Sequence, residues 1–207
     1  MIKTLWRELL YAELAKHALV GTTLDVGGDR ASQYHELMCE RPLDIRVANF
    51  ESKTKNDISC DLEKGIPVGD DLFDTVLCIN VLEHVFNYQQ LLAEMHRVMR
   101  KEGRLIIAVP FIIAYHPSPR DHWRFTSETL TNIVTEAGFR DVEIQTIGTG
   151  VFGALYQLSH GFLHFNSLRV CARYFAIFLD RLVSRFKKHN VYDKTHYPLG
   201  YVVIATK

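Results

Sequence analysis

The chain repeats one unit, an apolar strand-like run followed by a segment with helical periodicity. The clearest run is FDTVLCIN (73–80), which is unbroken and ends in a polar residue, as is typical of a strand covered on both faces. Similar runs occupy 22–26, 43–49, 56–62, 104–110, 142–148 and 197–207. Between them, helical periodicity predicts helices over 2–19, 31–41, 88–103 and 127–139, with Gly103 as a left-handed cap. This alternation predicts a doubly wound α/β fold, and 207 residues suit a single domain, 1–207.

The alternation breaks only before the last strand, where 151–196 reads as a helical insertion. Residues 168–189 of it carry basic side chains around one apolar stripe, formed by Val170, Tyr174, Ile177, Phe178, Leu182 and Phe186. Charged residues interrupt this stripe well short of the roughly 20 apolar residues that a membrane-spanning helix needs. Four roles for the segment stay open, namely packing on the sheet, a lid, a homodimer contact and a peripheral element on a membrane surface.

Composition excludes several classes of function. Lys plus Arg and Asp plus Glu both number 24, so no net field attracts nucleic acid, and we expect no nucleic-acid partner. The four cysteines are widely spaced and the N-terminal segment is charged, which predicts a cytoplasmic protein, peripheral to the inner face of the membrane if 168–189 binds there. His160 and His164 have the spacing of a metal pair but no evident third ligand, so we expect no metal site.

The loop after the first strand, DVGGDRAS, lies where doubly wound sheets bind ligands, at the carboxyl ends of the strands. It lacks the G-x-G-x-x-G pattern, which disfavours a nicotinamide-binding domain. Asp25 would suit a ligand that carries an ammonium or sulfonium group. An ordinary tight turn explains the loop equally well, and both interpretations stay open.

A longer stretch, DLEKGIPVGDDLFDTVLCINVLEHVFNYQQLLAEMHRVMRKEGRLIIAV (61–109), resembles class I S-adenosylmethionine-dependent methyltransferases of the group called type 11. The resemblance implies a seven-stranded, mostly parallel sheet with the last strand antiparallel, and S-adenosyl-L-methionine as the cofactor. It also implies a set of cofactor-binding residues. These are Asp25, Gly27 and Gly28 along the methionine part, Asn49 at the ribose, Asp61 and Leu62 at the adenine, and Asn80 and Leu82 beside the reacting methyl group.

In this architecture the loop HPSPRDHWRF (116–125) faces the methyl group, and it is rich in polar side chains. Transfer to a hydroxyl needs a base, for which histidine is the usual choice near neutral pH. We therefore expect His116 to be the base, with Asp121 orienting a histidine. The expected substrate-binding residues are His122, Trp123 and Arg124. Alternatively, Trp123 fills the core and Arg124 pairs with Asp121.

The segment VLEHV contributes two further candidates. We expect His84 to face the cleft as a third catalytic residue, and Glu83 to be a helix-start acid stabilised by the helix dipole.

The pattern of the loop 116–125 also resembles a subset of these methyltransferases found among bacterial surface-glycan enzymes. That resemblance implies transfer of a methyl group to a small-molecule or glycan hydroxyl, in polysaccharide or lipid-linked sugar biosynthesis. The alternative is a non-catalytic protein of the same fold that binds a partner or a glycan lipid.

Overall fold

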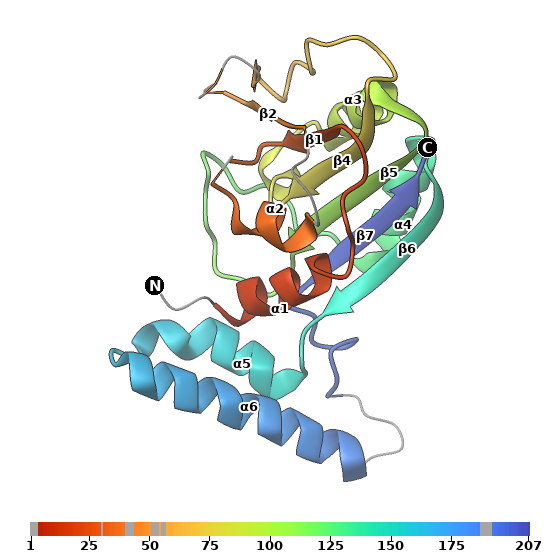
Figure 1. Cartoon of the computed structure of the whole chain (residues 1–207). Coiled ribbons are helices and arrows are strands. Elements are labelled where there is room, and N and C mark those ends of the chain that lie inside the picture. The colour runs from red at the N-terminus through yellow and green to blue at the C-terminus, as the bar shows by residue number, and fades with distance from the viewer. Residues whose placement is uncertain (1–3, 30, 40–43, 51–53, 55–56, 187–191) are drawn as a thin grey trace.

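The computed structural model describes residues 4–29, 31–39, 44–50, 54, 57–186 and 192–207. Its centre is one seven-stranded sheet with the order β3-β2-β1-β4-β5-β7-β6 (Figure 1). The strands are β1 (Thr23–Val26), β2 (Ile45–Asn49), β3 (Ile58–Ser59), β4 (Phe73–Ile79), β5 (Met99–Pro110), β6 (Arg140–Ile147) and β7 (Gly200–Thr206). Strand β7 runs antiparallel to both of its neighbours, whereas β1 to β5 pair in parallel. The predicted doubly wound sheet, with its last strand antiparallel, is confirmed.

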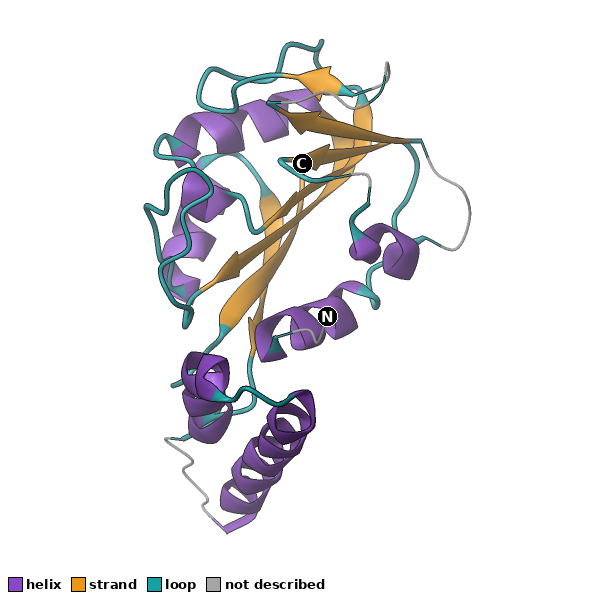
Figure 2. Cartoon of the chain, turned by 90° about the vertical axis from the view of Figure 1, so that its left-hand side faces the viewer, coloured by secondary structure: helices purple, strands orange, loops and turns teal. Residues whose placement is uncertain are grey.

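Helices cover both faces of this sheet (Figure 2). On one face α1 (Leu5–Leu14) and α2 (Gln33–Met38) form a hydrophobic core with the side chains that β4, β5 and β7 direct to that face. On the other face lie α3 (Tyr88–Val98) and α4 (Ser127–Glu136), packed on the alternate residues of the same strands. Burial on both faces explains why the central strands read as unbroken apolar runs.

Several predicted boundaries are wrong. The sequence pattern extends the first helix to residue 19, but α1 ends at Leu14. The sequence pattern extends the third covering helix to residue 103, but α3 ends at Val98 and β5 begins at Met99. Gly103 therefore lies in a strand, and the residue with a positive φ is Glu102, at 60°. A side chain at Gly103 would collide with Met99 Cγ and with the carbonyl oxygen of Arg100, at 2.6 and 2.7 Å from a Cβ. Close backbone packing at a bulge between β4 and β5, rather than a helix cap, requires this glycine.

The segment between β6 and β7 forms a helical hairpin that projects from one end of the sheet (Figures 1 and 2). It consists of α5 (Val151–Ser159), the short 3-10 helix η2 (His160–Phe162) and α6 (Asn166–Phe186). The hairpin is attached to α1, because the backbone N–H of Trp6 donates to Gln157 Oε1 at 3.2 Å and Arg173 pairs with Glu8. Within the described residues, no helix has both the length and the apolar content needed to span a membrane.

Candidate active site

A cleft of about 450 Å³ opens at the carboxyl ends of the parallel strands. That volume is in the range of small-molecule sites, and the position is the one expected for an open α/β sheet. Its walls come from the loops after β1, β2, β3 and β4, from the 3-10 helix η1 (Leu82–His84), and from the loop after β5. Seven of the residues predicted from the sequence line it: Gly27, Asn49, Asp61, Leu62, Asn80, His84 and His122.

Gly27 is required by the close approach of the loops after β1 and β4. Its φ is 71°, and a Cβ there would lie 2.6 Å from Val81 Cγ2. Asn49 fixes the same loop, because its side-chain amide donates to the carbonyl of Gly28 at 3.0 Å. Across the cleft, Asn80 accepts from the indole of Trp6 at 3.1 Å and has a φ of 54°. This part of the cleft is thus held in shape by contacts of the backbone and of two amide side chains.

Asp25 lies behind this part of the cleft and does not line it. It is fully buried, and its Oδ2 accepts from Tyr34 Oη at 2.6 Å and lies 2.7 Å from His35 Nε2. Burial raises the pKa of Asp25, and the contact with His35 opposes that shift. The same carboxylate explains why residue 28 is a glycine, because a Cβ there would lie 1.9 Å from Asp25 Oδ2. The structure therefore gives Asp25 and Gly28 roles in shaping the loop, without contact with the cleft.

The loop after β5 is fixed by its own ion pair. Arg124 forms a bidentate ion pair with Asp121: Nη1 donates to Oδ1 at 2.5 Å and Nη2 donates to Oδ2 at 2.7 Å. This pairing holds the pKa of Asp121 well below its usual range. Asp121 also accepts the backbone N–H of His116 at 3.0 Å. The alternative interpretation, in which Arg124 pairs with Asp121, is the arrangement that the structure has.

Trp123 packs in an aromatic cluster beside the cleft. Its ring stacks near Phe86 and Phe125 and meets Tyr88 edge-on at 5.3 Å, and its indole N–H donates to the carbonyl of Val85 at 3.2 Å. Phe125 is 3% exposed. The cluster anchors the loop to the start of α3, so its residues hold the cleft wall in place without lining it.

Glu83 is the residue that sequence reasoning missed. It lies in η1 and is fully buried, and neither of its carboxylate oxygens has a hydrogen-bond partner in the part of the chain that the structure describes. Burial raises the pKa of Glu83 to about 8, while its own backbone N–H and then Arg124 act in the opposite direction. Glu83 does lie in the first turn of a helix, as expected, but burial and not the helix dipole dominates its ionisation. The sequence signal for this role was an acidic residue that lies shortly after a buried strand and directly before a histidine.

The imidazoles of His84 and His116 stand beside this carboxyl group. Their ring centroids are 5.0 Å apart, and each Nδ1 donates to a backbone carbonyl, of Arg120 at 2.6 Å and of Ala114 at 3.2 Å. Burial lowers the pKa of His84, so this cleft-lining imidazole is neutral at neutral pH. His116 lies behind it and does not line the cleft, whereas Arg120 of the same loop does.

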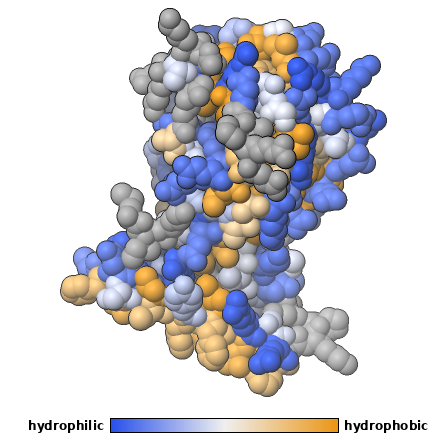
Figure 3. All heavy atoms as spheres, viewed as in Figure 1, coloured by the Kyte–Doolittle hydropathy of each residue, from blue (hydrophilic) through white to orange (hydrophobic). Residues whose placement is uncertain are grey.

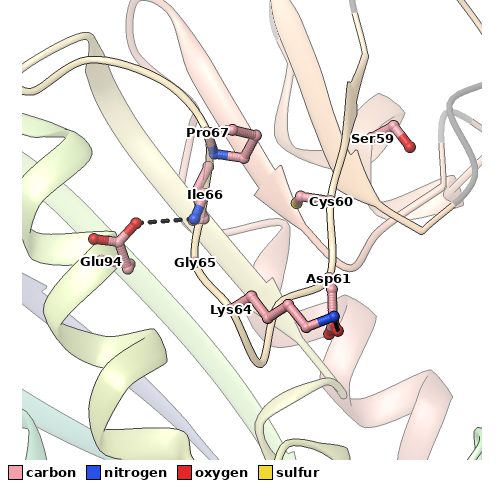
Figure 4. Close-up of a pocket in the computed structure, with 8 residues that line it drawn as sticks. All are labelled: Ser59, Cys60, Asp61, Lys64, Gly65, Ile66, Pro67 and Glu94. Atoms are coloured by element: carbon pink, nitrogen blue, oxygen red, sulfur yellow. Dashed lines mark hydrogen bonds and ion pairs between the residues drawn. The ribbon is translucent and has the colours of Figure 1, made fainter.

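Leu82, the last predicted cofactor residue, is fully buried in the core instead of lining the cleft. A second hollow, of about 300 Å³, shares Asp61 with the cleft and lies on the outer side of the β3 loop (Figure 4). Its polar groups satisfy one another. Glu94 accepts the backbone N–H of Ile66 at 2.8 Å, and Lys64 lies 3.2 Å from Asp61 (Figure 4). It therefore offers few free groups to a ligand.

A seven-stranded doubly wound sheet with an antiparallel last strand, and a cleft at its carboxyl edge, is the architecture of a class I S-adenosylmethionine-dependent methyltransferase domain. Comparison with known families agrees, since residues 31–107 match a methyltransferase domain. A solved structure of an S-adenosylmethionine-dependent methyltransferase from Archaeoglobus fulgidus shares the fold, with a TM-score of 0.61 and 19% identity over 97% of this chain and 94% of that one.

Two curated relatives match shorter stretches. An uncharacterized protein of Methanocaldococcus jannaschii is 52% identical over 44 residues, which are 21% of this chain and 19% of that protein. A probable S-adenosylmethionine-dependent methyltransferase of Mycobacterium tuberculosis is 29% identical over 83 residues, 37% of this chain and 30% of that protein. The chain thus spans less than a third of the length of these relatives. The comparisons thus show the fold and a methyltransferase-domain match over part of the chain, and they do not identify the acceptor.

Proposed function

We propose that this chain transfers the methyl group of S-adenosylmethionine to a hydroxyl group of a small molecule or a glycan. The observation that carries the proposal is the single cleft in which the loops after β1, β2 and β3 face a wall of imidazole and guanidinium groups. When bound, the cofactor supplies a methyl group already activated on sulfonium. The protein then has to position the acceptor, exclude water and receive a proton.

The cofactor fits the β1 to β3 side of the cleft. Gly27 lies at the cleft wall, and Asn49 and Asp61 provide polar groups at the ends of β2 and β3. Asp61 would accept from the adenine amine, and Leu62 would pack on the ring. Asn49 would meet the ribose through the second lone pair of Oδ1, since its amide donates to the loop after β1 and Oδ1 already accepts from the backbone N–H of Phe50 at 2.8 Å.

The acceptor would bind between His84, Arg120 and His122. Arg120 is exposed on the cleft and shows no ion pair among the described residues, so it replaces Arg124 as the clamp for an anionic group such as a sugar phosphate. The proton of the hydroxyl would leave to an imidazole Nε2 in the cluster formed by Glu83, His84 and His116. Asp121 would act as a positioning residue, because it holds the backbone of His116.

Isothermal titration with S-adenosylhomocysteine tests the cofactor part. We expect a clear binding signal that weakens roughly tenfold in Asp61→Ala, the loss of about one hydrogen bond. Ser59→Ala, in the neighbouring hollow, is the matched control and should bind as the unmodified protein does. No binding at about 1 mM ligand would favour the non-catalytic alternative instead. The acceptor part is tested by Arg120→Ala, which should raise the KM for a phosphorylated sugar and leave binding of S-adenosylhomocysteine unchanged.

We further infer that the hairpin of α5 and α6 rests on an anionic membrane surface. Large apolar side chains are exposed along it, namely Leu155, Leu158, Phe162, Phe165, Leu168, Tyr174, Phe175, Phe178, Leu182 and Phe186. They gather at the lower end of the molecule in Figure 3. Arg181 and Arg185 are exposed beside them, and a basic rim around an apolar face suits anionic headgroups. Such an orientation would bring a lipid-linked acceptor to a cytoplasmic enzyme.

Sedimentation with vesicles tests this orientation. We expect the protein to pellet with phosphatidylserine vesicles, less with phosphatidylcholine vesicles, and less again as the variant Phe178→Asp. Leu37→Asp replaces an exposed apolar residue on α2, away from the hairpin, and should bind as the unmodified protein does. A protein that stays soluble with both vesicles and sediments as a dimer would overturn the membrane proposal in favour of a homodimer contact.

A further inference from the structure

Three side chains at the wall of the cleft direct ligand atoms at one another. Glu83 and His84 come from η1, and His116 comes from the loop after β5. Oε1 of Glu83 lies 3.6 Å from His84 Nε2 and 3.8 Å from His116 Nε2. One ligand atom from each residue lies within 4.8 Å of the other two. Glu83 and His84 are adjacent in the sequence, and the loop after β5 brings His116 beside them.

The contacts of the two imidazoles fix the positions of their Nδ1 protons. Nδ1 of each imidazole donates to a backbone carbonyl, so the tautomer that these contacts select leaves a lone pair on Nε2. Glu83 contributes a carboxyl group that is fully buried and accepts no hydrogen bond from the described residues. Three acceptor atoms therefore face a common point to which no described neighbour donates. A shared proton or a metal cation can complete such an arrangement.

The charged neighbours do not supply that cation. Arg124 is the nearest one, and its guanidinium is committed to Asp121 and to the carbonyl of Trp123, at 2.5 to 2.8 Å. Arg120 meets the cluster through its carbonyl oxygen, which accepts from His84. The guanidinium groups of Arg124 and Arg120 therefore do not bind the free atoms of the cluster.

We propose that Glu83, His84 and His116 bind a divalent transition-metal ion of the Zn²⁺ type. Two imidazoles and one carboxylate are ligands that such ions share, and three protein ligands leave coordination positions open. With metal–ligand bonds of about 2.0–2.2 Å in tetrahedral geometry, ligand atoms stand roughly 3.4 Å apart, so the two spacings from Glu83 Oε1, 3.6 and 3.8 Å, need to close by only a few tenths of an ångström. The Nδ1 contacts with backbone carbonyls are the outer-shell bonds that usually orient metal-binding histidines.

This site revises the expectation that the chain has no metal site, which considered His160 and His164. Because His84 also lines the cleft, an open coordination position would face the acceptor. Resting here on the proposed function, we assign the ion the task of binding the acceptor hydroxyl and lowering its pKa. The released proton then passes to water instead of the cluster. The oxygen–carbon bond forms as the carbon–sulfur bond of the cofactor breaks.

Metal titration of the full chain, after removal of bound metal with a chelator, tests the site. We expect one equivalent of Zn²⁺ to bind, and bound Co²⁺ to give the visible absorption of a nitrogen- and oxygen-ligated ion. Outer-shell changes commonly cost 10–100-fold in affinity, so Glu83→Gln and His116→Ala should each weaken Zn²⁺ binding at least about 100-fold. His160→Ala is the matched control and should bind Zn²⁺ as tightly as the unmodified protein.

Two further readouts separate the possible outcomes. S-adenosylhomocysteine binding should be unchanged in Glu83→Gln, which shows that the variant is folded and tests the cofactor cleft independently of the metal. Equal Zn²⁺ affinity in Glu83→Gln and the unmodified protein would overturn the proposal and leave the cluster holding a proton. Loss of S-adenosylhomocysteine binding by the unmodified protein, with Zn²⁺ binding intact, would remove the proposed function and keep the metal site.

Discussion

Helices α3 and α6 are both amphipathic, yet they use their apolar faces in opposite ways. In α3 the four residues Leu91, Leu92, Met95 and Val98 are fully buried against the sheet. Helix α6 is about twice as long, and its buried residues are Arg173, Ala176 and Asp180, whereas its large apolar side chains face outward. Periodicity alone gives a helix two distinct faces, and what lies opposite decides which face is buried.

Polar anchors fix the orientation of α6. Arg173 pairs with Glu8 of α1. About two turns further on, Asp180 reaches the start of α5. It accepts from Thr149 Oγ1 at 2.7 Å and from the backbone N–H of Phe152 and Gly153 at 3.0 and 2.9 Å. These bonds hold the polar side of α6 against α1 and α5 and leave its apolar side exposed. Helix α3 covers the core, and α6 does not.

The largest difference in stability between the two helices is expected when an apolar side chain is removed from each. Leu92→Ala in α3 leaves a cavity in a packed core and should lower the free energy of unfolding by about 2–5 kcal/mol. Phe178→Ala in α6 removes a side chain that is 56% exposed and should change it by less than about 0.5 kcal/mol. Urea unfolding followed by circular dichroism measures both. Equal losses would mean that the α6 face is covered in solution by another surface of the protein.

The sequence predicts the existence of both helices and the class of the sheet, because each depends on local periodicity. It does not predict which side of α6 is buried, since Arg173 and Asp180 find their partners in distant segments, at Glu8 and at the start of α5. The same division holds in the cleft. Gly27, Asp61 and Asn80 follow from strand order, because ligand loops meet at one edge of the sheet.

The pairings Asp25 with His35 and Asp121 with Arg124 depend on side-chain geometry, and they redirect residues that the motifs assign to ligands. Glu83 is the reverse case. Its identity suggests an ordinary surface acid, and only the fold reveals that it is buried beside two histidines. Motif reasoning therefore locates the cleft and its strand-end loops, and leaves the charge pairing inside them open.

An intermediate effect is expected when the anchor of α6 is removed. Asp180→Ala leaves two backbone N–H groups at the start of α5 and the hydroxyl of Thr149 without their acceptor, and should lower the free energy of unfolding by about 2–3 kcal/mol. Because the anchor joins the hairpin rather than the sheet, hydrogen exchange should increase in α5 and α6 and stay unchanged in α3. An increase spread evenly over all helices would contradict this contrast between α3 and α6.

The smallest effect concerns charge on the rim of α3, where Arg97 binds Glu94 at 2.7 and 2.8 Å and Asp70 at 2.7 Å. The bond to Arg97 lowers the pKa of Glu94 from its ordinary value of 4.5, so the folded protein releases this proton at lower pH than the unfolded chain does. The stabilisation is therefore complete above pH 4.5 and is lost as the pH falls through the lowered value. Glu94→Gln should cost less than about 1 kcal/mol at neutral pH, and its difference from the unmodified protein should shrink in acid. Urea midpoints at several pH values measure this, and a difference that stays constant across that range would show that packing of the side chain, rather than the ion pair with Arg97, stabilises the rim of α3.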